Sequence, residues 1–293
     1  MLFRSGLRET MAGVLAMLDD NGVYGTVATY GQSYTPLAAG RDSPEFQQQL
    51  DASLLQRLGD LRAALAELDR MQADGRFAGR LDLDRIGLVG RSFGGVTTLM
   101  GLGLEPRFTA GFSVVPPGYA DVRKFIPPEF LAPPGQESVL LSADGGFPLA
   151  EFNKPTFLLS GAEDHLIIQL AAAVAEQVGL PAPTPESPHS LLRAAYEASE
   201  APVVWGLLQD SNHSTLGVSG GYWWPELKPG TMTRYFAPEE EFTLIAPELA
   251  QRMQREKALA FFDLYIRGDE SARERVLDQS WRQSGLILES RNL

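Results

Sequence analysis

The fold is decided by residues 85–96, whose sequence is Arg85-Ile86-Gly87-Leu88-Val89-Gly90-Arg91-Ser92-Phe93-Gly94-Gly95-Val96. A short apolar run meets the pattern G-x-S-x-G at residues 90–94, and a small, apolar segment follows as far as Leu104. This order predicts a buried strand, a tight turn with Ser92 at its apex, and a helix that begins at once. A Gly-Ser-Gly cluster alone is usually a loop, but the strand before it and the helix after it favour a nucleophilic serine.

The turn around Ser92 restricts its neighbours. A serine in a strained backbone conformation requires that the residues two before and two after it lack a bulky side chain, and Gly90 and Gly94 meet that need. Gly95 allows the helix to lie close to the strands. We therefore expect Ser92 Oγ at the carboxyl edge of a sheet, above the positive end of a helix.

The composition is that of a globular chain. It has 293 residues, of which 44% are hydrophobic and 21% charged, and this length suffices for one large core. The net charge of -12 disfavours nucleic acid and anionic membrane surfaces as partners, because both require a basic face. No apolar run approaches the roughly 20 residues that span a bilayer. Since the start, Met1-Leu2-Phe3-Arg4, lacks the features of a signal peptide, a cytoplasmic location is expected.

Cysteine is absent and histidine is scarce, which narrows the possible chemistry. The absence of cysteine excludes disulfides, thiolate metal sites and a cysteine nucleophile. The three histidines, His165, His189 and His213, form no H-x-x-x-H pair. A metal site is therefore disfavoured, and no metal or cofactor is predicted.

Strand and helix signals alternate along the chain. Strands are predicted at 23–30, 86–89, 108–115, 155–160 and 202–208, and helices at 10–20, 54–71, 96–104, 165–178, 191–198 and 247–267. Alternation of this kind predicts an α/β fold, with a mainly parallel sheet flanked by helices.

The long connections are predicted to be insertions in one domain, residues 1–293, because strands resume after each. Residues 31–50 and 209–240 are predicted as loops, and the stretches 117–153, 180–201 and 215–240 as insertions over the site. The last of these contains Tyr222, Trp223 and Trp224. Their aromatic side chains are candidates for lining a substrate pocket, and simple packing of a bulky loop is the equal alternative.

A serine nucleophile needs an orienting acid and a base. Asp164 follows the strand at 155–160, and a carboxylate at that strand end can reach a histidine in the next loop. Glu163 and Asp144 are weaker candidates for the acid. The alternative for Asp164 is a helix N-cap, since it precedes a helical segment.

The base is predicted to be His213, which lies just beyond the strand at 202–208. The chain order is then Ser92, Asp164, His213, which is the order of an α/β-hydrolase. His165 is interpreted instead as a residue of a first helical turn. His189, among prolines and serine, is interpreted as a surface loop residue.

Two backbone amides are candidates for stabilising an oxyanion. The amide of Phe93, the residue after the nucleophile, is one of them. A second should come from the loop after an earlier strand, and the Leu7 amide, in Ser5-Gly6-Leu7, is the candidate.

Together, Ser5-Gly6-Leu7, Gly90-Arg91-Ser92-Phe93-Gly94-Gly95, Gly161-x-x-Asp164 and His213 resemble the α/β-hydrolase superfamily. They look most like its branch of plasma-type platelet-activating-factor acetylhydrolases and dienelactone-hydrolase-like esterases. The resemblance implies Ser92 as nucleophile, Asp164 and His213 as its triad partners, and the Leu7 and Phe93 amides as oxyanion donors.

The chain departs from that family in three places. Arg91 stands where the family has histidine, which makes it a candidate substrate-binding residue, and Arg4-Ser5 replaces Ser-His. The chain also begins where the family's third strand should be, so the first two strands are expected to be missing and the sheet to have about six.

These features predict a serine hydrolase that cleaves carboxylic esters through a Ser-His-Asp triad and an acyl-enzyme intermediate. Its expected substrate is a small-molecule or lipid-like ester. The alternative is a protein that keeps the α/β-hydrolase fold for binding, without turnover, or a shortened and inactive homologue.

Overall fold

The computed structural model describes residues 44–73, 77–116, 154–178, 181–217 and 231–293. They belong to two compact units, the first formed by residues 1–83 and 123–145 and the second by residues 84–122 and 146–293. The strand predicted at 23–30 and the helix predicted at 10–20 lie outside the described residues. The single domain over 1–293 stays a prediction.

The first unit contains one long helix, α3 (Pro44–Ala73). The helix predicted at 54–71 is confirmed, but the prediction of a loop over 31–50 is wrong for residues 44–50. Proline is well suited to the first position of a helix, since its φ is preset and its missing N–H has no partner there. The glutamines that follow are good helix formers, so the helix begins well before residue 54.

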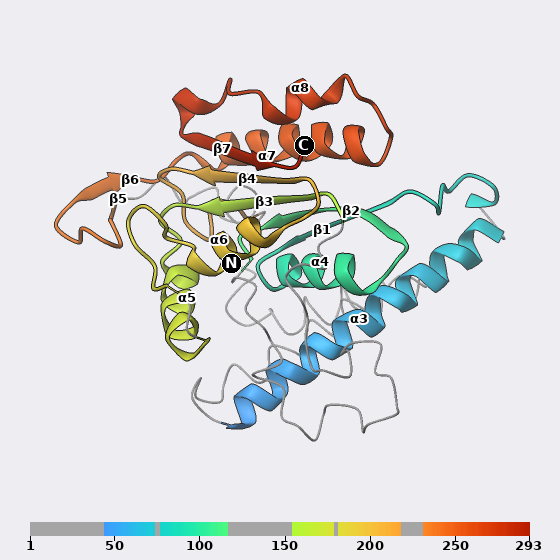
Figure 1. Cartoon of the computed structure of the whole chain (residues 1–293), viewed down its shortest axis with the longest axis horizontal. Coiled ribbons are helices and arrows are strands. Elements are labelled where there is room, and N and C mark those ends of the chain that lie inside the picture. Colours follow the sequence, from blue (N-terminus) through green and yellow to red (C-terminus); the bar gives the residue numbers. More distant parts are fainter. Residues whose placement is uncertain (1–43, 74–76, 117–153, 179–180, 218–230) are drawn as a thin grey trace, which may run out of the picture. The chain divides into compact units, whose positions relative to one another are not determined.

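The second unit is built on a five-stranded sheet in the order β1-β2-β3-β4-β7 (Figure 1). The strands β1 (Ile86–Arg91), β2 (Phe108–Val114), β3 (Thr156–Gly161) and β4 (Val203–Leu208) are parallel. The last strand, β7 (Leu286–Arg291), pairs antiparallel with β4. The predicted α/β fold, a mainly parallel sheet flanked by helices, is confirmed, and β7 is an addition that the sequence analysis did not predict.

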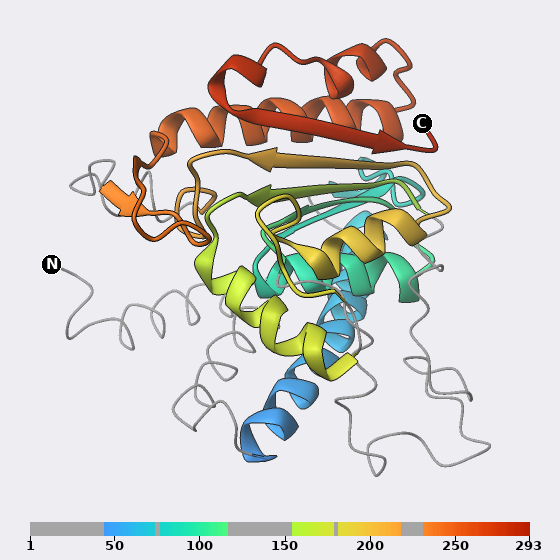
Figure 2. The ribbon, with the colours of Figure 1, turned by 60° about the vertical axis from the view of Figure 1, so that its left-hand side comes forward.

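Helices cover both faces of this sheet (Figures 1 and 2). One face carries α4 (Phe93–Leu104), α5 (His165–Val178) and α6 (Ser190–Ala198). The other carries α7 (Pro247–Tyr265) and α8 (Ala272–Leu277). The helices predicted at 96–104, 165–178, 191–198 and 247–267 are therefore confirmed, with ends that shift by a few residues.

The core beneath α7 is aromatic. Phe112 of β2 stacks on Phe157 of β3 with ring centroids 4.5 Å apart, and Phe261 of α7 meets Phe157 edge to face at 5.8 Å. All three side chains are fully buried. Alternate residues of β2 point to opposite faces, so Phe112 faces α7 while Gly111 admits Leu102 of α4.

A short hairpin lies beyond the carboxyl ends of β3 and β4 (Figures 1 and 2). Its strands are β5 (Thr231–Thr233) and β6 (Glu241–Thr243), which pair antiparallel. The prediction of a loop throughout 209–240 is wrong for β5. Three residues give too short a pattern to predict a strand, and the pairing with β6 stabilises it.

Candidate active site

Ser92 lies at the junction of β1 and α4, as the sequence predicts. Its φ of 56° and ψ of -121° place a non-glycine residue in a rarely occupied region, which is a strained conformation. Its amide donates to the carbonyl of Val114 in β2 at 2.8 Å, so the strained turn is hydrogen-bonded to the neighbouring strand.

The glycines around Ser92 differ in their importance. A Cβ at Gly90 would overlap the carbonyl oxygen of Gly94, and one at Gly95 would lie 2.9 Å from Ser113 Oγ. Both residues must therefore lack a side chain, as predicted. At Gly94, no described neighbour lies within 4 Å of a Cβ placed there, so the same requirement stays a prediction for this residue.

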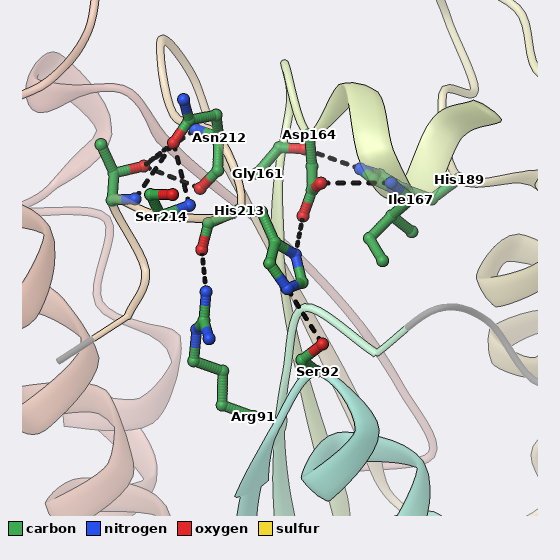
Figure 3. A network of polar contacts seen from close by, with 10 residues as sticks. Arg91, Ser92, Gly161, Asp164, Ile167, His189, Asn212, His213 and Ser214 are labelled. Atoms are coloured by element: carbon green, nitrogen blue, oxygen red, sulfur yellow. Dashed lines mark hydrogen bonds and ion pairs between the residues drawn. The ribbon is translucent and has the colours of Figure 1, made fainter. Parts of the chain in front are cut away.

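Ser92, His213 and Asp164 form a continuous chain of hydrogen bonds (Figure 3). His213 Nε2 lies 2.9 Å from Ser92 Oγ, and His213 Nδ1 lies 2.8 Å from Asp164 Oδ2. A carboxylate only accepts, so Nδ1 carries the proton and Nε2 is left to accept the proton of the serine hydroxyl. This is the geometry of a general base that is oriented by an acid.

Asp164 also caps a helix. Its Oδ1 accepts from the Ile167 amide at 3.2 Å, three residues into α5, while Oδ2 accepts from His213. The side chain of Asp164 is fully buried and that of His213 is 18% exposed. The N-cap contact and the contact with His213 therefore use different carboxylate oxygens, so the two interpretations of Asp164 are compatible. Its catalytic role stays a prediction.

The other described candidates, Glu163, His165 and His189, make different contacts from those of Asp164 and His213. Glu163 binds Arg234, and Asp144 lies outside the described residues. His165 is the first residue of α5, as predicted, with its Nε2 3.5 Å from Glu163 Oε2. The prediction that His189 is a surface residue is wrong, because its side chain is buried behind Asp164.

His189 supports the turn that carries Asp164. Its Nε2 lies 2.7 Å from the carbonyl oxygen of Gly161, so this nitrogen is the protonated one. Burial lowers the pKa of His189, although the hydrogen bond to Gly161 and the charge of Asp164 act in the opposite direction. Its Nδ1 has no hydrogen-bond partner among the described residues, and the ring is therefore held neutral.

The loop that carries His213 is stiffened by its own side chains. Asn212 Oδ1 accepts from the amides of Ser214 at 3.0 Å and Thr215 at 3.1 Å. Thr215 Oγ1 donates to the Asn212 carbonyl at 2.8 Å. Asn212 therefore serves as the centre of a turn.

Arg91 contacts the same loop from the end of β1 (Figure 3). Its Nη2 donates to the backbone carbonyl of His213, and its guanidinium lies against Gly217. The guanidinium thus binds the backbone of the residue that we expect to act as base. The predicted contact of Arg91 with substrate stays a prediction.

The oxyanion and substrate-binding residues complete the set of predicted site residues. Phe93 directly follows Ser92 and is the first residue of α4, and its role as an oxyanion donor stays a prediction. Leu7, Tyr222, Trp223 and Trp224 lie outside the described residues, and their roles stay predictions. Within the described ranges, no group of three or more histidine and acidic side chains could hold a metal ion.

The chain is similar to solved structures, among them a ferulic acid esterase from Streptomyces cinnamoneus that is 21% identical, with a TM-score of 0.45. The match covers 74% of this chain and 49% of that one, so the chain spans about half the length of this esterase. No protein-family model matches the chain, and no curated protein matches it.

None of the described helices combines the length and the apolar character needed to cross a membrane.

The fold and the site together define an α/β protein with a Ser-His-Asp hydrogen-bond chain at the carboxyl edge of its sheet.

Proposed function

We propose that this protein is a serine hydrolase of the α/β-hydrolase superfamily and that it cleaves carboxylic esters. One observation carries the proposal: the chain from Asp164 through His213 to Ser92, with contacts of 2.8 and 2.9 Å, ends on a serine held at positive φ. Hydrogen bonding of this kind makes a serine hydroxyl a competent nucleophile at neutral pH. Within the superfamily we propose the branch of platelet-activating-factor acetylhydrolases and dienelactone-hydrolase-like esterases.

The reaction follows from the roles of the three side chains. Ser92 Oγ attacks the ester carbonyl carbon while its proton passes to His213 Nε2, and Asp164 stabilises the imidazolium. The same proton is then delivered to the leaving alkoxide, which departs as an alcohol and leaves an acyl-enzyme on Ser92. Water, deprotonated by His213, releases the acid and restores the serine.

The negative charge on the carbonyl oxygen needs donors. We assign this role to the amides of Phe93 and Leu7, of which Phe93 is next to the nucleophile at the start of α4. A helix N-terminus favours negative charge, and removal of one such donor typically costs about 10²–10³-fold in rate. Arg91, Tyr222, Trp223 and Trp224 are proposed to contact a small-molecule or lipid-like ester.

The test is the hydrolysis of p-nitrophenyl acetate and butyrate by the wild type beside Ser92→Ala. We expect turnover by the wild type and a loss of at least about 10⁴-fold in kcat for the variant, with unchanged melting temperature. Equal turnover by both proteins would refute the assignment of Ser92. A folded wild type without turnover on any ester would favour the alternative, a binding protein that keeps the fold.

A further inference from the structure

Arg234, directly after β5, lies between two carboxylates that belong to the turns of the site. Its Nη1 is 3.0 Å from Glu163 Oε1, and its Nη2 is 2.8 Å from Asp210 Oδ1. Glu163 immediately precedes Asp164 in the turn after β3, and Asp210 stands three residues before His213 in the turn after β4. One guanidinium therefore bridges the turn of the acid and the turn of the base.

The bridge is held from several directions. The Tyr235 amide donates to the second oxygen of Glu163 at 2.9 Å. The Arg234 amide donates to the Glu240 carbonyl, and its guanidinium carbon lies 4.3 Å from the centroid of the Phe242 ring. The guanidinium is thus fixed by the β5–β6 hairpin as well as by its ion pairs. Because the Glu163 side chain is only 11% exposed, removing the guanidinium leaves a largely buried carboxylate that has lost its arginine partner.

The two turns also touch each other directly. The Glu163 amide donates to the Ser211 carbonyl at 2.9 Å. Asp210, at the corner of the second turn, has a φ of 51°, a left-handed conformation that aspartate tolerates better than most residues. Its carbonyl accepts from the Ile245 amide at 2.8 Å. Asp210 thus stands in the same short turn as His213, and that turn is hydrogen-bonded both to Glu163 and to Ile245.

We propose that Arg234 is a positioning residue that fixes the Asp164 turn against the His213 turn through its two ion pairs. This inference rests on the proposed function of the same site. Arginine suits the task because its planar fork can bind two carboxylates at once, whereas lysine supplies one compact charge. Neither substrate nor Ser92 contacts Arg234 in this account, and its effect passes through His213 and Asp164 alone.

The test compares Arg234→Met with Arg193→Met. Arg193 is a matched control, since it binds both oxygens of Glu289 at 2.7 and 2.9 Å and lies 4.3 Å above the Trp205 ring, but it joins α6 to β7. We expect Arg234→Met to lower kcat on p-nitrophenyl butyrate about tenfold or more while KM stays within about twofold, because misplaced reacting groups slow chemistry more than binding. Labelling of Ser92 by a fluorophosphonate should slow by the same factor, and Arg193→Met should change neither rate.

Milder variants keep the test valid where Arg234→Met fails to fold. Asp210→Asn removes one charge while keeping a residue that tolerates left-handed backbone, and Glu163→Gln removes the other. Each should lower kcat by less than Arg234→Met, and Arg234→Lys should restore part of the loss.

A spectroscopic measurement separates this inference from the proposed function. The proton shared by His213 Nδ1 and Asp164 gives a far-downfield NMR signal that reports their alignment without any turnover. It should persist in Arg193→Met and be lost or broadened in Arg234→Met. Rates and a signal in Arg234→Met equal to those of Arg193→Met would overturn the role of Arg234. A wild type that shows the signal but no turnover would refute the hydrolase and leave the positioning role in place.

Discussion

The turns at the carboxyl edge of the sheet and the core beneath α7 are held by opposite kinds of interaction. The turns place Ser92 and Asp210 at φ of 56° and 51° and hold them with hydrogen bonds and ion pairs. The core holds Phe112, Phe157 and Phe261 by apolar burial. Apolar burial is non-directional and supplies most of the stability of a fold, whereas each hydrogen bond adds little net stability but fixes a direction. Activity and stability should therefore be separable by mutation.

Among variants that keep Ser92, the largest effect is expected for Asp164→Asn. An amide in place of the carboxylate cannot stabilise the imidazolium and favours the wrong tautomer of His213, so kcat should fall by about 10⁴-fold. The asparagine oxygen can still accept from the Ile167 amide and cap α5. Steady-state kinetics and a thermal melt check this, and a variant whose melting temperature falls sharply while its kcat stays near that of the wild type would contradict the separation of the two regions.

The reverse pattern is expected in the core. Leu264→Ala on α7, where the side chain is 4% exposed, should lower the free energy of unfolding by about 2–5 kcal/mol. Leu259→Ala on the same helix, where the side chain is 65% exposed, should change it by no more than about 0.5 kcal/mol. Denaturant titration measures both, and kcat below the melting transition should match the wild type in each.

Gly90→Ala should lower both the free energy of unfolding and kcat, because Gly90 packs closely against the start of α4 beside Ser92. The added Cβ would overlap the Gly94 carbonyl, and the backbone shift that removes this overlap costs about 1–3 kcal/mol. The same shift should displace Ser92 and so lower kcat. Gly94→Ala is the matched control, since a Cβ there meets no described neighbour within 4 Å. Should the two alanine variants prove equally impaired in melting temperature and kcat, the crowding at Gly90 is not what shapes the turn.

The smallest effect is expected for His189 and depends on pH. Its folded pKa lies below the ordinary value of 6.5 because of burial, so protonation favours the unfolded state. At a pH above 6.5, the His189 ring is neutral in both the folded and the unfolded state, so it does not change the free energy of unfolding. As the pH drops below 6.5, the unfolded state takes up a proton first and the free energy of unfolding falls. His189→Gln can still donate to the Gly161 carbonyl but does not titrate. Melting temperatures from pH 7.5 to pH 5 should fall more steeply for the wild type, and parallel curves would contradict this.

The sequence predicts the parts of the site that depend on local pattern. Ser92, Asp164 and His213 each follow an apolar strand, and the carboxyl ends of parallel strands share one edge, so their meeting follows from chain order. The strands β1 to β4 and the helices α4 to α7 carry clear periodicity for the same reason.

The parts that depend on distant contacts could not be predicted. The prolines around His189 indicate a surface loop. The residue is nevertheless buried, with its ring against the Gly161 carbonyl at the end of β3, and this contact spans 28 residues of the chain. No local signal joins Arg234 to Glu163, which are 71 residues apart, or identifies β7 as a strand that reverses direction beside β4. Contacts between residues so far apart in the chain depend on the three-dimensional arrangement of the sheet, which local sequence patterns do not encode.

The most direct test of the account is the labelling of the purified wild type with a fluorophosphonate, read by intact mass and peptide mapping. We expect one adduct per chain, on Ser92, and none on Ser92→Ala or on a wild type that has been unfolded beforehand. A folded wild type that takes no label, or that takes it on another serine, would contradict the assignment of Ser92 as a nucleophile activated by His213 and Asp164.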